Sequence, residues 1–86
     1  MFNPLDQTAH PISHEELKKL ISHFRINTLD DSQCVDIRAA LESARSDGKI
    51  SQYKIHHILK NLRGVGKINV YDQSAIENAF GDFFGV

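Results

Sequence analysis

The chain has 86 residues, of which 41% are hydrophobic and 24% are charged, and its formal net charge is −1. This composition is typical of a globular protein and argues against intrinsic disorder, and the length is sufficient for one small core but not for two. No apolar run approaches the roughly 20 residues of a membrane span, and the N-terminus lacks the pattern of a secretory signal, so we expect a cytoplasmic protein without a membrane partner.

The first eleven residues differ from the rest of the chain. Pro4 and Pro11 stand among polar residues that show no hydrophobic period, a pattern typical of extended segments near a terminus. We therefore predict an extended N-terminal arm over residues 1–11 and a single helical domain over residues 12–86.

A first helix is predicted to begin at Ser13. The pattern Ser13-x-x-Glu16 is a capping box, and Ile12 can pack on Leu17 as a hydrophobic staple. Apolar residues then recur at the spacing i, i+3, i+4, i+7, which lines one face of a helix. We expect this face to consist of Leu17, Leu20, Ile21 and Phe24.

A second helix is predicted over about 31–45. Asp30 and Gln33 have the spacing of a cap, and the segment Ser46-Asp47-Gly48 ends the helix. Its predicted buried face contains Cys34, Ile37, Leu41 and Ala44. As the single cysteine, Cys34 cannot form an intramolecular disulfide, and its place in the pattern predicts a small buried residue without chemistry.

Two further helices complete the predicted domain. One spans about 52–63, with Ser51 as its cap and Gly64 as its left-handed stop. The other begins with Asp72 as its cap, has a wide apolar stripe and is weakened by Gly81. The stripe consists of Ile76, Ala79, Phe80, Phe83 and Phe84.

The predicted fold class is all-α, a compact bundle of about four short helices. The sequence Gly-Lys-Ile occurs at residues 48–50 and again at 66–68, and alternation around the second copy suggests a short strand. A minimal two-stranded contact between these two segments would then complete the bundle.

Charge is divided unevenly along the chain. Residues 1–44 hold four basic and seven acidic side chains, residues 45–67 hold six basic and one acidic, and residues 68–86 hold three acidic and no basic. A basic surface of this kind could contact phosphates or an acidic protein, or it could be a solvated face balanced by its acidic neighbours. The candidate binding residues are Arg45, Lys49, Lys54, His57, Lys60, Arg63 and Lys67.

Two local patterns resemble DNA-binding motifs. The segment 62–68, Leu-Arg-Gly-Val-Gly-Lys-Ile, resembles the hairpin of helix-hairpin-helix proteins, which implies backbone N–H groups offered to a DNA phosphate. The second and third predicted helices resemble a helix-turn-helix pair, and this resemblance implies that the third helix reads DNA. It would present Gln52, Lys54, His56, His57, Lys60 and Arg63.

No metal or cofactor site is predicted. Residues 46–50 resemble the middle of an EF-hand calcium loop, but that alignment puts Ser43, Arg45 and Lys54 at ligand positions, and two of these are cations. Four of the histidines form two pairs in the sequence. Pro11 breaks the helix within the first pair, and the two members of the second pair are adjacent, so they point to different faces. The two pairs are His10 with His14, and His56 with His57.

The functional hypothesis is a small non-enzymatic protein-binding module, an adaptor, inhibitor or regulatory subunit, that engages an acidic partner through its basic helix surface. No local pattern combines a nucleophile, a base and an orienting group, so no catalytic residue is predicted. The alternative is a nucleic-acid-binding regulator that uses the same cations. Phe83 and Phe84, if partly uncovered, would form an apolar interface for a partner or a second copy of the chain.

Overall fold

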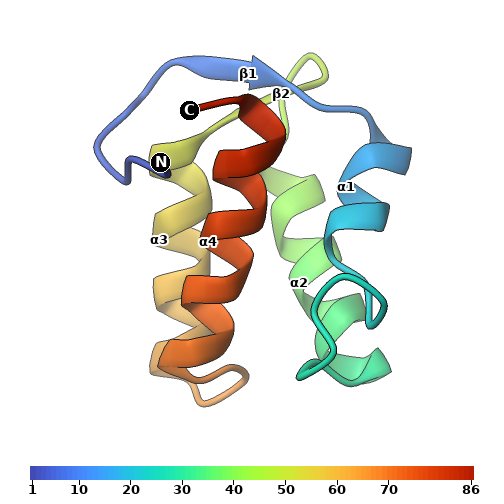
Figure 1. Cartoon of the computed structure of the whole chain (residues 1–86). Helices are drawn as coiled ribbons and strands as arrows, with labels where there is room; N and C mark the ends of the chain where they lie inside the picture. Colours follow the sequence, from blue (N-terminus) through green and yellow to red (C-terminus); the bar gives the residue numbers. More distant parts are fainter.

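The computed structural model covers all 86 residues and consists of four helices and two short strands. In chain order these are β1 (Ala9–Pro11), α1 (His14–Leu20), α2 (Asp31–Ala44), β2 (Lys49–Ser51), α3 (Gln52–Gly64) and α4 (Val70–Phe84). Helices α3 and α4 pack side by side, α2 and α1 lie on the other side of the bundle, and the strands cross one end (Figure 1). The predicted helical bundle with a minimal strand contact is confirmed.

Three of the four helices begin at the predicted caps. The side chains of Ser13, Asp30 and Ser51 accept hydrogen bonds from backbone N–H groups in the first turns of α1, α2 and α3. The prediction of Asp72 as the cap of α4 is wrong, because Asn69 is the cap and Asp72 completes its capping box. The reciprocal pair satisfies two backbone donors instead of one, which favours the earlier start.

Helix α1 ends earlier than its hydrophobic spacing suggests. Leu17, Leu20 and Ile21 are buried as predicted, but the prediction of Phe24 as a core residue is wrong, because its side chain is fully exposed. The backbone leaves the helical path at Ile21, and from that point the helical spacing no longer determines which side chains face the core. Ile26 and Leu29 enter the core from the following loop instead.

The two strands pair in a way that the sequence pattern did not indicate. β2 pairs antiparallel with β1, and His10 lies opposite Ile50. The predicted contact between the two Gly-Lys-Ile segments is therefore wrong, since the second segment leads directly into the cap of α4. The turn before β2 has positive φ at both Asp47 (54°) and Gly48 (73°), and Ser46 and Lys49 close it with two backbone hydrogen bonds. This geometry matches the twist of an antiparallel hairpin.

Helix α3 continues through Gly64, so the predicted stop at that residue is wrong. Gly66, with φ of 81°, supplies the left-handed residue instead. Its N–H donates to the carbonyl of Arg63, and the N–H of Lys67 donates to the carbonyl of Leu62. These two bonds form a Schellman motif, in which the residue after the cap needs positive φ.

The N-terminal arm packs on the ends of two helices. Gln52 is fully buried, and its side chain accepts a hydrogen bond from the N–H of Asn3 (2.7 Å) and donates one to Asp6 Oδ2 (2.8 Å). Phe2 lies against α4 at Gly81, where a Cβ atom would come within 2.9 Å of the Phe2 nitrogen. Gly81 would weaken α4 as an isolated helix, but its lack of a side chain allows the arm to pack against α4.

Candidate functional site

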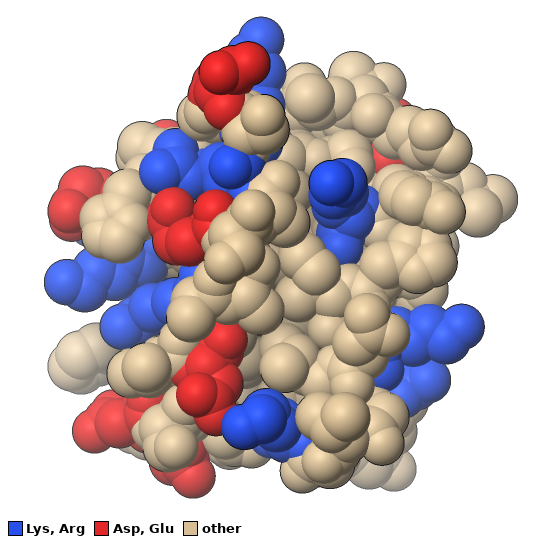
Figure 2. Space-filling model, turned by 180° about the vertical axis from the view of Figure 1, so that it is seen from behind, with Lys and Arg blue, Asp and Glu red and all other residues tan.

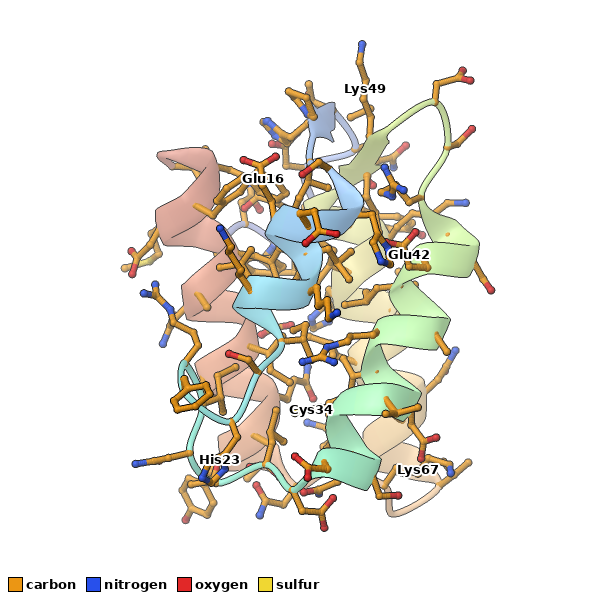
Figure 3. All side chains as sticks on the ribbon, turned by 90° about the vertical axis from the view of Figure 1, so that its right-hand side faces the viewer. Glu16, His23, Cys34, Glu42, Lys49 and Lys67 are labelled. Carbon is orange, nitrogen blue, oxygen red and sulfur yellow. The ribbon has the colours of Figure 1, made fainter.

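The seven predicted binding residues are distributed along the whole length of the bundle. Lys49 lies at the strand end and Lys67 lies at the opposite end, beyond α3 (Figure 3). Between them, α3 carries four of the seven, Lys54, His57, Lys60 and Arg63. The structure thus places four of the seven along α3, with Arg45 at the end of α2, Lys49 in β2 and Lys67 beyond α3.

The orientation of the four α3 residues follows from helical geometry. Lys54 and Arg63 are nine residues apart, which is about two and a half turns and roughly 13 to 14 Å along the axis. These two side chains therefore leave the helix on opposite sides, and His57 and Lys60 lie on the arc between them. All four are exposed, so the cations form a band around the outer face of α3 and not a single cluster.

Arg45 is committed to structural contacts. Its guanidinium donates to Glu42 Oε2 at 3.1 and 3.2 Å and to the backbone carbonyl of Ile12 at 3.2 Å. Glu42 also accepts a hydrogen bond from His14 (2.9 Å), which joins α1 to α2. Burial opposes the charged form of Glu42, but the hydrogen bonds from His14 and Arg45 hold the pKa of this carboxyl below its ordinary value. Arg45 is therefore part of the scaffold.

Lys67 has a partner that it can release. Its Nζ lies 3.1 Å from Asp36 Oδ2, and the two side chains are 51% and 41% exposed. Ion pairs at this exposure contribute only about 0 to 1 kcal/mol to stability. Lys67 could therefore exchange Asp36 for an external anion at little cost.

The remaining cations have no carboxylate within ion-pair distance. Lys49, Lys54, Lys60 and Arg63 make no salt bridge, and His57 packs edge-on against Tyr53 with ring centroids 4.3 Å apart. Seen from behind, basic side chains on the α3 side stand mostly among uncharged neighbours, whereas acidic and basic groups alternate over α1 and α2 (Figure 2). The uneven charge along the sequence thus persists on the surface.

Two residues expected on the exposed face of α3 serve the fold instead. Gln52 is buried beneath the arm, and His56 Nδ1 donates to Glu77 Oε2 of α4 at 2.6 Å. The expectation that Gln52 is presented on the exposed face is wrong, whereas His56 is partly exposed and pairs with Glu77. Amphipathic spacing does not identify which polar side chains at the edge of a helix will find partners on neighbouring elements.

The turn after α3 has already used its backbone donors. The N–H groups of Val65, Gly66 and Lys67 all donate to carbonyls in the last turn of α3. The helix-hairpin-helix motif would need such donors to point toward a phosphate. These three are engaged within the helix cap.

The two predicted interface aromatics differ in exposure. Phe84 is half-buried and stacks on His10 of β1, with ring centroids 4.7 Å apart. Phe83 is 37% exposed and lines a surface hollow together with Lys19 and Arg25. Phe83 is therefore the more exposed of the two rings.

The structure has a second basic region that the sequence pattern did not indicate. A hollow of about 530 Å³ lies beside α1 and is lined by Lys18, Lys19, Arg25 and Arg38 around the exposed ring of Phe24. These four cations are all the lysines and arginines of residues 1–44. Seven carboxylates lie in the same segment, so its net charge is negative and gives no sign of a basic surface. Their spacing gave no signal, because the loop after α1 brings them together.

The metal-ligating side chains are dispersed, and the one thiol is buried. No group of three or more His, Cys, Asp or Glu side chains is placed to hold a metal ion. The thiol of Cys34 is buried as predicted, and burial raises its pKa, which disfavours the reactive thiolate. No helix has both the length and the apolar character needed to span a bilayer.

Comparisons with protein-family models, with characterised proteins and with solved structures find no match for this chain. Any function must therefore be inferred from the surface of the protein itself.

Proposed function

We propose that this protein is a non-enzymatic protein-binding module that engages an acidic partner through the outer face of α3. The observation that supports this most directly is the set of exposed cations without carboxylate partners on one helix, Lys54, Lys60 and Arg63. Charges of this kind raise association rates and select complementary surfaces.

The support of α3 suits a binding surface that keeps its shape. Its inner face is held by Ile55 and Leu59, both fully buried, and its N-terminal turn is fixed by the arm through Gln52. His56 ties its edge to α4. The outer face can therefore meet a partner without reorganisation of the backbone, which lowers the entropic cost of binding.

Two features favour a protein over a nucleic acid. A reading helix places its N-terminal residues in the major groove, but here the backbone N–H of Tyr53 donates to the backbone carbonyl of Asp6 and the arm covers that turn. The net charge of −1 also gives little long-range attraction to a polyanion. Contact between the α3 cations and phosphates remains the alternative hypothesis.

The test is affinity capture from the native source at low salt, with the captured protein and nucleic acid both analysed. We expect a specific protein that is retained by the wild type and lost with the double variant Lys60→Glu/Arg63→Glu. The variant Lys18→Glu/Lys19→Glu makes the same change in net charge on the opposite side of the bundle and should retain that protein.

Two results would count against the proposal. One is that no captured protein is lost with the α3 variant, because the chosen surface would then be wrong. The other is retention of duplex or single-stranded DNA that weakens steeply with salt and disappears with the α3 variant, which would favour the nucleic-acid alternative.

A further inference from the structure

The loop after α1 presents an aromatic ring to solvent although its backbone is anchored. Ile26 and Leu29 are buried, and Thr28 Oγ1 donates to Asp72 at the start of α4 (2.9 Å). On the other side, Arg38 Nε donates to the carbonyl of Ile21 at 2.6 Å. Phe24, in the middle of this anchored loop, is nevertheless fully exposed. A Phe side chain gains about 1.5 to 3 kcal/mol from burial, so a partner that covers this ring would obtain that gain.

Two adjoining hollows surround this loop. The larger, of about 530 Å³, has Phe24 as its apolar wall, and the smaller, of about 320 Å³, is lined by Leu20 and Phe83. Lys19 and Arg25 line both. The combined surface therefore has an aromatic ring in each hollow, and the two cations that line both hollows lie between the rings.

The cations of this surface are largely uncompensated. Lys18, Lys19 and Arg25 make no salt bridge, and the hydrogen bond from Arg38 goes to an uncharged carbonyl. The two carboxylates in the linings are Glu15 and Glu16. Glu16 accepts the N–H of Ser13 in the capping box. Four cations thus face two carboxylates, one of which already has a partner.

We propose that this surface, defined by Phe24, Phe83 and the four cations Lys18, Lys19, Arg25 and Arg38, binds a short acidic peptide segment that carries apolar side chains. Carboxylates of the peptide would contact Lys19 and Arg25, while an apolar side chain on either side would pack on Phe24 and Phe83. Buried aromatic and arginine side chains are the groups that contribute most to such interfaces.

A peptide fits these observations better than other anions. A nucleic acid strand carries a charge at every residue and would bring phosphates against Glu15 and Glu16, whereas a peptide can place its acidic and apolar groups separately. A lipid surface would require the rings to project from a common plane. Phe83 is only 37% exposed and sits in a hollow.

This surface is distinct from the outer face of α3. Helices α1 and α3 lie on opposite sides of the bundle (Figure 1), and the view toward α1 shows the loop with His23 below it, between α4 and α2 (Figure 3). Two partners could therefore be bound at once, and the protein would act as an adaptor. The peptide site does not depend on the function proposed for α3.

The experiment is selection of random dodecapeptides displayed on phage, followed by titration of the selected peptides against purified full-length protein. We expect enrichment of peptides with several Asp or Glu residues and at least one Phe, Leu or Trp. Phe24→Ser and Arg25→Glu should each weaken their binding by about tenfold or more, the size typical of a hot-spot residue. Circular dichroism of each variant checks that the fold persists.

Two matched variants serve as controls. Val65→Ser also removes an exposed apolar side chain, and Lys60→Glu/Arg63→Glu also reverses charge, but both lie away from the loop. Each should leave peptide affinity within about twofold of wild type. The latter variant also separates this proposal from the one for α3, since loss of the α3 partner with retention of the peptide would leave the two independent.

Several outcomes would overturn the proposal. Selection without acidic enrichment, or selected peptides that bind Phe24→Ser as well as wild type, would exclude the site. A further such outcome is a protein that binds no peptide but binds single-stranded oligothymidylate or vesicles containing phosphatidylserine. If that binding depends on Phe24 and Arg25, the surface belongs to a different class of ligand.

Discussion

Gly81→Ala provides a sharp test of how the N-terminal arm is attached. In an isolated helix this change is favourable by about 1 kcal/mol, because glycine has the larger conformational entropy to lose. In the folded chain, the added Cβ would lie 2.9 Å from the nitrogen of Phe2 and 3.2 Å from its Cα and Cβ. The nearest atoms are mostly backbone and cannot rotate away.

The structure can relieve this contact in two ways. Either α4 and the arm separate slightly, at a typical overpacking cost of about 1 to 3 kcal/mol, or the arm lifts away. In the second case, Phe2 loses its partial burial and Gln52 Oε1 loses the N–H of Asn3, and an unsatisfied buried acceptor costs about 1 to 3 kcal/mol. After the propensity gain of about 1 kcal/mol is subtracted, we expect a net loss of up to about 2 kcal/mol in the free energy of unfolding.

The assay is a double-mutant cycle measured by urea unfolding with circular dichroism. Its second change replaces residues 1–4 with a single initiator Met, which removes Phe2 and its contact with Gly81. In the shortened chain, Gly81→Ala should stabilise by up to about 1 kcal/mol, so the coupling between the two changes should be about 1 to 3 kcal/mol. Gly64→Ala measures the propensity gain alone, because no neighbouring atom lies within 4 Å of the added Cβ. If Gly81→Ala stabilises the full-length and shortened chains equally, the arm does not pack on α4 and this account is wrong.

Two further predictions concern the end of α3 and the acid stability of the arm. Gly66→Ala should lower the free energy of unfolding by about 1 to 2 kcal/mol, because φ of 81° places an L side chain in the left-handed region. Equal effects of Gly66→Ala and Gly64→Ala in urea unfolding would contradict the Schellman motif. Hydrogen bonds to the carboxylate of Asp6, first from Thr8 and then from His10 and Gln52, lower its pKa from 3.8 to about 2. Because the folded-state pKa is depressed, this contribution to stability is present above about pH 4 and is lost as the pH falls toward 2. Asp6→Asn removes the titrating group and should therefore reduce the loss of stability between about pH 4 and pH 2. Urea unfolding at each pH measures this loss. An unchanged pH profile would show that the Asp6 contacts do not persist in solution.

Much of the helical framework could be predicted from the sequence, because its determinants are local. Capping residues act within one turn, so Ser13, Asp30 and Ser51 identify three helix starts correctly. The buried face of α2 follows from spacing alone, and Ile37 and Leu41 lie in the core as expected. The prediction missed Asn69 as the cap of α4, because its capping-box partner Asp72 is itself a residue type favoured at caps.

The candidate surfaces were less accessible to prediction. The sequence located the cations of α3, but it could not show that Arg45 is held by Glu42 or that Gln52 is buried under the arm. It also gave no indication of the second basic surface. Lys19, Arg25 and Arg38 come from different segments, and the loop that joins α1 to α2 determines their proximity.

The sequence by itself determined that this chain forms four short helices with one apolar core and a basic third helix, since caps, hydrophobic period and charge act over a few residues. Tertiary structure alone decided which strand pairs with β2, why α4 contains Gly81, and that Phe24 faces solvent beside four cations. These features arise from contacts between residues far apart in the chain. Such contacts depend on the distance and direction between packed elements, and no local pattern specifies these.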